Sequence, residues 1–174
     1  MKTKKMIVTA LLIACSFIGA NLKMMGTIAF DSMPGFLGAL LLGPFWGALI
    51  GAAGHFLTAL LSGFILTLPI HLEIMCIMAV AMSAFGLIYR KLAGKGSKAL
   101  HAPVAAGIAA IFLNGPASVA LLSPQLLPVM GKAGLVTLAW ILTAAATLNV
   151  AAALLLFRLL NNKLKLLGVH DDEN

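Results

Sequence analysis

The chain has 174 residues, of which 61% are hydrophobic and 10% are charged, and its mean hydropathy is +1.07. A soluble domain carries about 25% charged residues, and a disordered chain is poor in apolar residues, so both classes are excluded. The apolar stretches are continuous and do not alternate with polar residues, which disfavours a transmembrane barrel. The composition predicts an all-α integral membrane protein in which residues 1–174 form one transmembrane helical bundle.

The chain has 12 Lys and Arg against 5 Asp and Glu, a net charge of +7. In a membrane protein, such an excess indicates cationic loops that face the cytoplasm and anionic lipid. We therefore expect the lipid bilayer as a partner and no nucleic acid. The two cysteines, Cys15 and Cys76, lie inside apolar runs without CxxC spacing, and we expect buried thiols rather than a disulfide or a metal site.

Apolar runs in chain order predict six spans. The first, 6–22, follows three lysines, and the run from 33 to 70 is too long for one span. Proline lacks an amide donor and clashes with the preceding turn, so Gly43-Pro44 divides that run into a short helix, 33–43, and a longer one, 46–64. The remaining predicted spans are 72–89, 102–122 and 134–160, separated by a basic stretch and by a connection over 123–132 that contains two prolines.

The basic residues also predict the orientation of the bundle. With the N-terminus inside, the outer connections contain only Lys23 and Lys132, whereas the inner side holds ten basic residues: Lys2, Lys4, Lys5, Arg90, Lys91, Lys95, Lys98, Arg158, Lys163 and Lys165. This bias places both termini in the cytoplasm. Four spans are an alternative if 33–64 forms one re-entrant unit. Cleavage of residues 1–20 as a signal peptide is a second alternative, which the apolar run to residue 22 disfavours.

Polar residues in an apolar chain are candidates for function, because burying them in a membrane is costly. Asp31 and Glu73 are the only acids before the C-terminal tail, and both fall at the predicted outer end. They form either a polar pocket or interfacial ion pairs with Lys23 and Lys132. Asp31 also has a structural alternative as the cap of the helix that follows it.

Further candidates lie at the outer end or within the spans. His71, Gln125 and Asn114 are possible ligand contacts, and Trp140 is either a stacking wall for a flat ring or an interfacial belt residue. The structural interpretation of His55 is hydrogen bonding to a neighbouring group. For Asn114 and Asn149 it is a hydrogen bond between helices.

Small residues recur every four positions in two places. The series Gly35, Ala39, Gly43, Gly47 and Gly51 indicates internal helix packing, whereas Ala10 and Ala14 indicate either packing or a docking surface for a partner. The sequence contains no GxxxxGK[ST], HExxH or GxSxG motif and no metal-spaced Cys/His cluster. We therefore expect no enzyme activity, no cofactor and no metal site.

These features resemble the substrate-binding S-components of energy-coupling factor (ECF) vitamin transporters. The size and six-span layout match, Ala10-x-x-x-Ala14 is similar to the family's docking motif, and the stretches 31–38 and 42–51 are similar to its loop one and helices two and three. The resemblance implies vitamin capture from outside the bacterial cytoplasmic membrane. It also implies docking on a transmembrane coupling subunit that carries two ATPase subunits, which supply the energy.

Within this family the chain is most similar to the group assigned to alpha-ribazole, the benzimidazole nucleoside of cobalamin. For this cargo we expect Phe30 and Trp140 to cover the ring, and Asp31, Asn114, Gln125 or Glu73 to bind ribose hydroxyls. Thiamin, a queuosine precursor or a flavin would use the same residue types. The alternative class is an accessory membrane subunit without a ligand, whose small-residue faces serve assembly.

Overall fold

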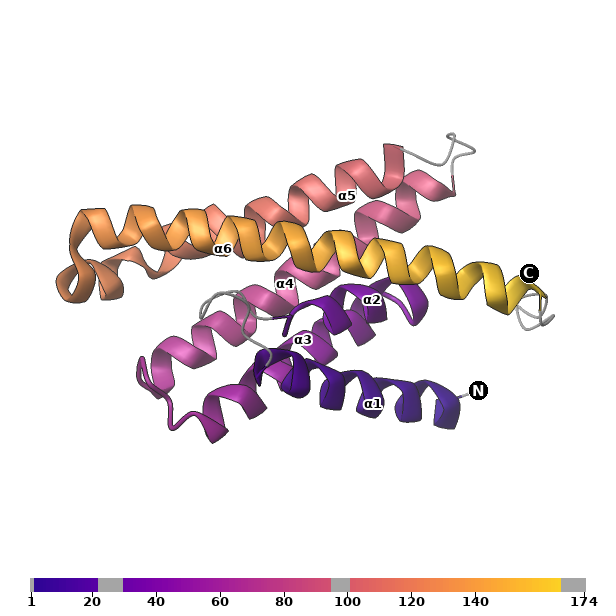
Figure 1. Cartoon of the computed structure of the whole chain (residues 1–174), viewed down its shortest axis with the longest axis horizontal. Coiled ribbons are helices and arrows are strands. Elements are labelled where there is room, and N and C mark those ends of the chain that lie inside the picture. The colour runs from indigo at the N-terminus through magenta and orange to yellow at the C-terminus, as the bar shows by residue number, and fades with distance from the viewer. Residues whose placement is uncertain (1, 22–29, 95–100, 167–174) are drawn as a thin grey trace.

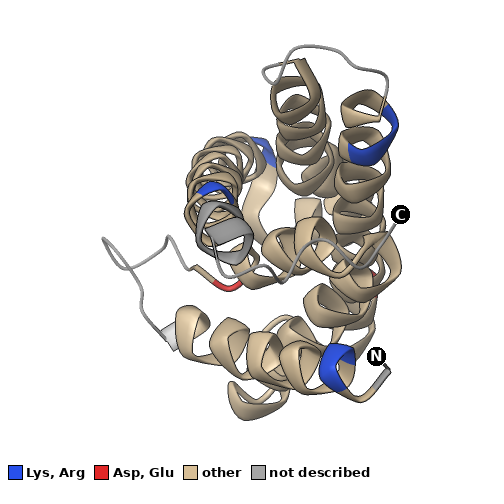
Figure 2. Ribbon diagram, turned by 90° about the vertical axis from the view of Figure 1, so that its right-hand side faces the viewer, with Lys and Arg blue, Asp and Glu red and all other residues tan. Residues whose placement is uncertain are grey.

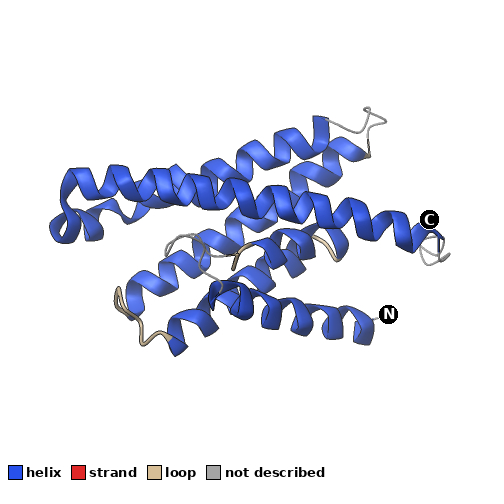
Figure 3. Cartoon of the chain, in the orientation of Figure 1, coloured by secondary structure: helices blue, strands red, loops and turns tan. Residues whose placement is uncertain are grey.

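The computed structural model describes residues 2–21, 30–94 and 101–166, and every regular element within these ranges is helical (Figures 1 and 3). The elements are α1 (Lys2–Asn21), α2 (Met33–Leu41), α3 (Pro44–Leu61), α4 (Leu68–Ala93), α5 (His101–Phe112), the π-helical turn η1 (Leu113–Ala117) and α6 (Ser118–Leu166). The predicted all-α class is confirmed for these residues.

The longest helix, α6, reverses direction at Gly131. This glycine has φ 66° and ψ 178°, a backbone conformation that other residues rarely adopt, and the chain turns back there (Figure 1). The second part of α6 then packs against η1, where a Cβ on Gly115 would lie 2.8 Å from Thr143 Oγ1. The expected connection over 123–132 is therefore mostly wrong: α6 continues through Pro124 and Pro128, because a membrane helix tolerates prolines whose freed carbonyls find other partners.

Four stretches of the described residues are long and apolar enough to cross a membrane: Thr3–Ala20, Pro44–Leu61, Leu68–Ala93 and His101–Leu160. The fourth is 60 residues long and contains the reversal at Gly131, so it passes through the fold twice. Helix α2 has nine residues, about 14 Å at 1.5 Å per residue, which is too short to cross a hydrocarbon core of about 30 Å. The count of six spans stays a prediction.

The start of α1 and the end of α6 lie at the same end of the bundle as the end of α4 and the start of α5 (Figure 1). Basic residues gather at this end: Lys4 and Lys5 are in the first turns of α1, and Arg90 and Lys91 are in the last turn of α4. Figure 2, which looks onto this end, shows Lys and Arg on several helices. The α3–α4 turn and the reversal of α6 lie at the opposite end (Figure 1).

Small residues bring α2, α3 and α4 into close contact. A Cβ on Gly47 would lie 2.4 Å from the Cβ of Ala39, and the side chain of Met82 fills the space beside Gly35 and Gly51, where an added Cβ would lie 2.2 Å and 2.0 Å from its sulfur. The predicted packing role of this glycine series is confirmed. These close contacts hold α2 against α3 and α4. The candidate site lies at the start of α2.

Helix α1 turns a buried polar side, with Thr9 and Ser16, toward the bundle. Its opposite side is apolar and exposed, and Ala10 and Ala14 lie on it. Cys15 and Cys76 are exposed as well, so the expectation of buried thiols was wrong. An apolar neighbourhood in sequence does not indicate burial in a membrane protein, because the outer surface of the bundle is apolar too.

Candidate functional site

A cavity of about 250 Å³, more enclosed than the open grooves on the outer surface, lies between the start of α2, α3, α4, η1 and both parts of α6. Its walls are mostly aliphatic: Leu66, Ile74, Ile77, Met78, Leu122, Leu126, Leu138, Leu142, Ala145 and Ala146. Five polar residues interrupt them: Asp31, Ser32, His55, Asn114 and Ser118. A mostly apolar cavity with a few convergent polar groups is the usual form of a small-molecule site.

Hydrogen bonds from two other helices hold the segment that carries Asp31. The hydroxyl of Ser16 in α1 donates to the Asp31 carbonyl oxygen, and the Phe30 amide donates to the Gly19 carbonyl at 3.1 Å. On the other side, Oδ1 of the fully buried Asn149 accepts a hydrogen bond of 2.8 Å from the Met33 amide. The predicted role of Asn149 in joining helices is thus confirmed, and it satisfies one of the unpaired amides at the start of α2.

Asp31 itself does not cap α2. The N-cap residue is Ser32, and no side chain of the cap hydrogen-bonds to the helix, so the capping alternative for Asp31 was wrong. The carboxyl of Asp31 accepts a hydrogen bond of 3.2 Å from the Ser32 hydroxyl. Desolvation by the surrounding protein raises the pKa of Asp31, and the hydrogen bonds with Ser32 oppose this shift. The side chain is therefore a polar group held at the cavity at an energetic cost.

His55 and His71 form a hydrogen-bonded pair between α3 and α4. His55 Nε2 and His71 Nδ1 are 3.2 Å apart, and the other ring nitrogen of His71, Nε2, accepts from the Leu66 amide at 3.5 Å. The structural interpretation of His55, hydrogen bonding to a neighbouring group, is confirmed. His55 also borders the cavity, whereas His71 does not.

Asn114 and Ser118 approach the cavity from η1 and the start of α6. The Ser118 hydroxyl donates to the carbonyls of Gly115 and Asn114, at 2.6 Å and 3.2 Å. Within the described ranges, the side-chain amide of Asn114 has no hydrogen-bond partner, so it is available to a ligand. Single π-helical turns occur often at functional sites, and here the turn sets Asn114 beside the cavity.

The other predicted site residues lie away from this cavity. Glu73 accepts hydrogen bonds of 2.7 Å from the Gln125 amide on both carboxylate oxygens, on the exposed surface. Of the two predicted counter-charges, Lys132 is exposed in α6 and Lys23 lies outside the described residues. Phe30 is half-buried but does not border the cavity, and Trp140 is 74% exposed on the outer face of α6.

The set of ligand contacts expected from sequence lacks three polar residues that border the cavity: Ser32, Ser118 and His55, the last of which was expected only to bond to a neighbouring group. A signal existed for two of them. His55 is an ionisable residue inside an apolar helix, and Ser118 follows Asn114 by four positions, which places both on one helix face.

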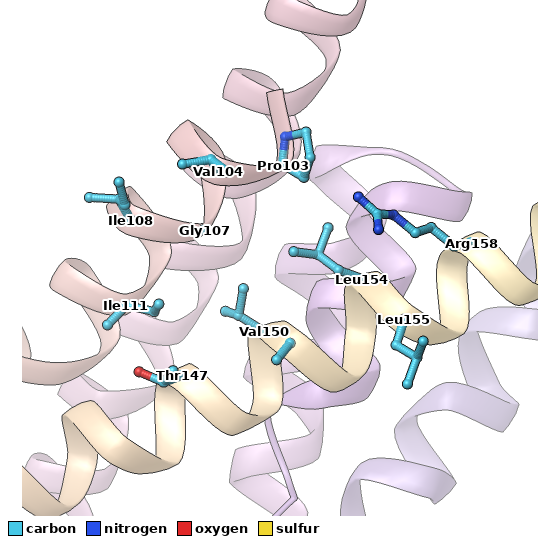
Figure 4. Close-up of a pocket in the computed structure, with 11 residues that line it drawn as sticks. Pro103, Val104, Gly107, Ile108, Ile111, Thr147, Val150, Leu154, Leu155 and Arg158 are labelled. Atoms are coloured by element: carbon cyan, nitrogen blue, oxygen red, sulfur yellow. The ribbon is translucent and has the colours of Figure 1, made fainter. Parts of the chain in front are cut away.

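A second hollow, between α5 and α6, is larger but differs in kind. It measures about 390 Å³, is lined mainly by aliphatic side chains, and opens to the outer surface. Figure 4 shows its labelled residues, with Val150 and Leu154 of α6 facing α5. Its polar side chains are Thr147, which hydrogen-bonds to its own helix at 2.7 Å, and Arg158 at one end. An open apolar groove on a membrane protein fits an acyl chain better than a polar cargo, so we assign the site to the enclosed cavity.

A family model described as "ECF transporter, substrate-specific component" matches residues 4–168, and the chain belongs to this family. No curated protein and no solved structure matches the chain. The family consists of membrane proteins that bind a small-molecule substrate for uptake and work with an ECF module. The protein is therefore a substrate-binding subunit of a transporter.

Proposed function

We propose that this ECF substrate-specific component captures a vitamin precursor in the enclosed cavity, and that the cargo is alpha-ribazole. The observation that carries the proposal is the cavity itself, in which Asp31, His55 and Asn114 face an aliphatic enclosure. A benzimidazole ring matches the aliphatic walls, and the ribose hydroxyls match a carboxyl and an amide that both accept hydrogen bonds.

The contact set we propose is Asp31, Ser32, His55, Asn114 and Ser118. Two of these, Asp31 and Asn114, belong to the set expected from sequence. Trp140 is not included, because its ring lies on the outer face of α6. In its place, leucines 122, 126, 138 and 142 supply the apolar walls. A cavity of about 250 Å³ is near the lower limit of small-molecule pockets, ~300 Å³, which favours a small nucleoside over a flavin or cobalamin.

We further propose that the basic end of the bundle faces the cytoplasm of a bacterial cell. The cavity is then reached from the outer side, where the α3–α4 turn contributes Leu66 to its wall. Ala10 and Ala14, on the exposed side of α1, form the docking surface for a coupling subunit. Two ATPase subunits supply the energy, in keeping with the lack of a nucleotide-binding motif in this sequence.

The test is alpha-ribazole binding to two variants that add the same bulk to neighbouring positions of α6. Ala145 borders the cavity, whereas Ala144 is exposed on the outer face. In detergent-purified protein, titration calorimetry is expected to show loss of binding in Ala145→Phe and wild-type affinity in Ala144→Phe. Equal binding by both folded variants would place the site elsewhere. Absence of binding in the wild type would favour another vitamin or an accessory subunit without cargo.

A further inference from the structure

The contacts around His71 indicate where its proton lies. The Leu66 amide, 3.5 Å from His71 Nε2, can only donate, so this contact favours an unprotonated Nε2 on His71. A neutral imidazole carries its proton on the other nitrogen, which for His71 is Nδ1. His71 is therefore the donor in the 3.2 Å contact, and Nε2 of His55 is the acceptor.

The same reasoning gives the position of the proton on His55. Because its Nε2 accepts from His71, the proton of neutral His55 lies on Nδ1. Nδ1 is then the one polar ring atom of His55 left for the cavity that this residue borders. Among the described residues, none accepts a hydrogen bond from it.

The turn that supplies the Leu66 amide has an unusual backbone. Phe64 has φ 50° and Thr67 has φ 85°, values that are rare for residues other than glycine and that persist only where the surroundings fix them. The Thr67 amide donates to the Phe64 carbonyl at 2.8 Å, and the ring of Phe64 lies 5.8 Å from that of His71. The donor that sets the His71 tautomer therefore belongs to a defined turn.

We propose that His71 is a positioning residue that fixes the tautomer of His55, so that His55 presents Nδ1–H to the cavity and selects a cargo with a hydrogen-bond acceptor there. The chemical class is a neutral heterocycle with an unprotonated ring nitrogen. The proposal rests on the proposed function, since it names the chemistry by which that site recognises its cargo. A metal held by the two rings is a different use of the pair, but no third His, Cys, Asp or Glu joins them within the described part of the chain.

The first test needs no ligand. In protein labelled with ¹⁵N-histidine, NMR distinguishes protonated from unprotonated ring nitrogens, and single replacement of each of the four histidines assigns the signals. We expect Nδ1–H on both His55 and His71. In His71→Leu the His55 tautomer is expected to change, whereas His71→Asn retains an amide donor near the Nδ1 position and is expected to preserve it. A proton on Nε2 of His55 in the wild-type protein would overturn the inference.

The second test compares alpha-ribazole with its indole analogue, in which CH replaces the unprotonated ring nitrogen. The wild-type protein is expected to bind the analogue on the order of 10- to 100-fold more weakly, because the His55 donor is left unpaired. His71→Leu should remove this preference, and His71→Asn should restore part of it. Equal affinity of the wild type for both compounds would refute the selection. If alpha-ribazole does not bind at all, the proposed cargo fails, and the NMR result alone decides the inference about His55.

Discussion

Replacement of Asn149 tests whether a residue outside the cavity shapes it. Asn149 is fully buried in α6, and its Oδ1 accepts the 2.8 Å hydrogen bond from the Met33 amide. In Asn149→Leu, that amide loses its partner at the start of α2, and a similarly branched but larger apolar side chain takes the place of the asparagine. A buried donor left unpaired costs about 1–3 kcal/mol, and hydrogen bonds between membrane helices average about 0.6 kcal/mol, so we expect a loss of about 1–2 kcal/mol.

The effect on binding follows from the position of Met33. It comes two residues after Asp31 and directly after Ser32, and both of these border the cavity. We therefore expect Asn149→Leu to weaken cargo binding, although the residue does not touch the cavity. Equilibrium unfolding in mixed micelles measures the stability, and calorimetry measures the affinity.

Two further variants distinguish the loss of the Met33 hydrogen bond from a general effect of substitution in α6. Asn149→Asp keeps an acceptor for the Met33 amide, and Thr147→Ala removes an exposed hydroxyl that bonds only within α6. We expect Asn149→Asp to bind cargo better than Asn149→Leu, and Thr147→Ala to match the wild type. If Asn149→Leu is as stable as the wild type and binds cargo equally well, the reasoning about the start of α2 is refuted.

Three other predictions concern packing, the cavity and docking. Gly47→Ala places a Cβ 2.7 Å from the backbone Cα of Ala39 and should cost about 1–3 kcal/mol, whereas Gly107→Ala, 3.4 Å from a side chain, should be neutral or gain up to about 1 kcal/mol; thermal unfolding that ranks the two in reverse would contradict this. Because the folded protein raises the pKa of Asp31 above 3.8, its stability should fall as pH rises through that raised value. Asp31→Asn should therefore unfold at a higher temperature at neutral pH yet bind cargo about tenfold more weakly, and a variant that loses both stability and binding would count against this role. Ala10→Leu with Ala14→Leu should leave cargo binding unchanged but abolish assembly with the coupling subunit and uptake into proteoliposomes. The control Ile7→Leu should bind, assemble and transport like the wild type. Normal uptake by the double variant would show that α1 is not the docking surface.

Local rules predicted the parts of the fold that depend on a few adjacent residues. The break at Gly43-Pro44 is an example: Gly43 has φ 119°, and α3 begins at Pro44. The reversal at Gly131 was harder to predict, because the two prolines upstream are equally strong signals for a helix end in the sequence. Whether these prolines end the helix depends on how the second part of α6 packs, and the sequence does not show that packing.

The candidate site depended on contacts between distant residues. Asn149 and Met33 are 116 positions apart, and His55 and His71 are 16 apart, and no spacing rule joins such pairs. Trp140 illustrates a second limit. In a membrane bundle the outer face is as apolar as the core, so hydropathy does not indicate which side of α6 faces inward.

The central claim is that the enclosed cavity binds a small nucleoside, and ligand-induced thermal stabilisation tests it most directly. The panel for detergent-purified protein is alpha-ribazole, dimethylbenzimidazole, cobalamin, thiamin, riboflavin, biotin and queuine. A ligand at 100 times its dissociation constant stabilises the folded state by about 2.7 kcal/mol. We predict a clear shift with alpha-ribazole that disappears in Ala145→Phe and persists in Ala144→Phe. No shift with any compound, or a shift that Ala145→Phe retains, would contradict the claim.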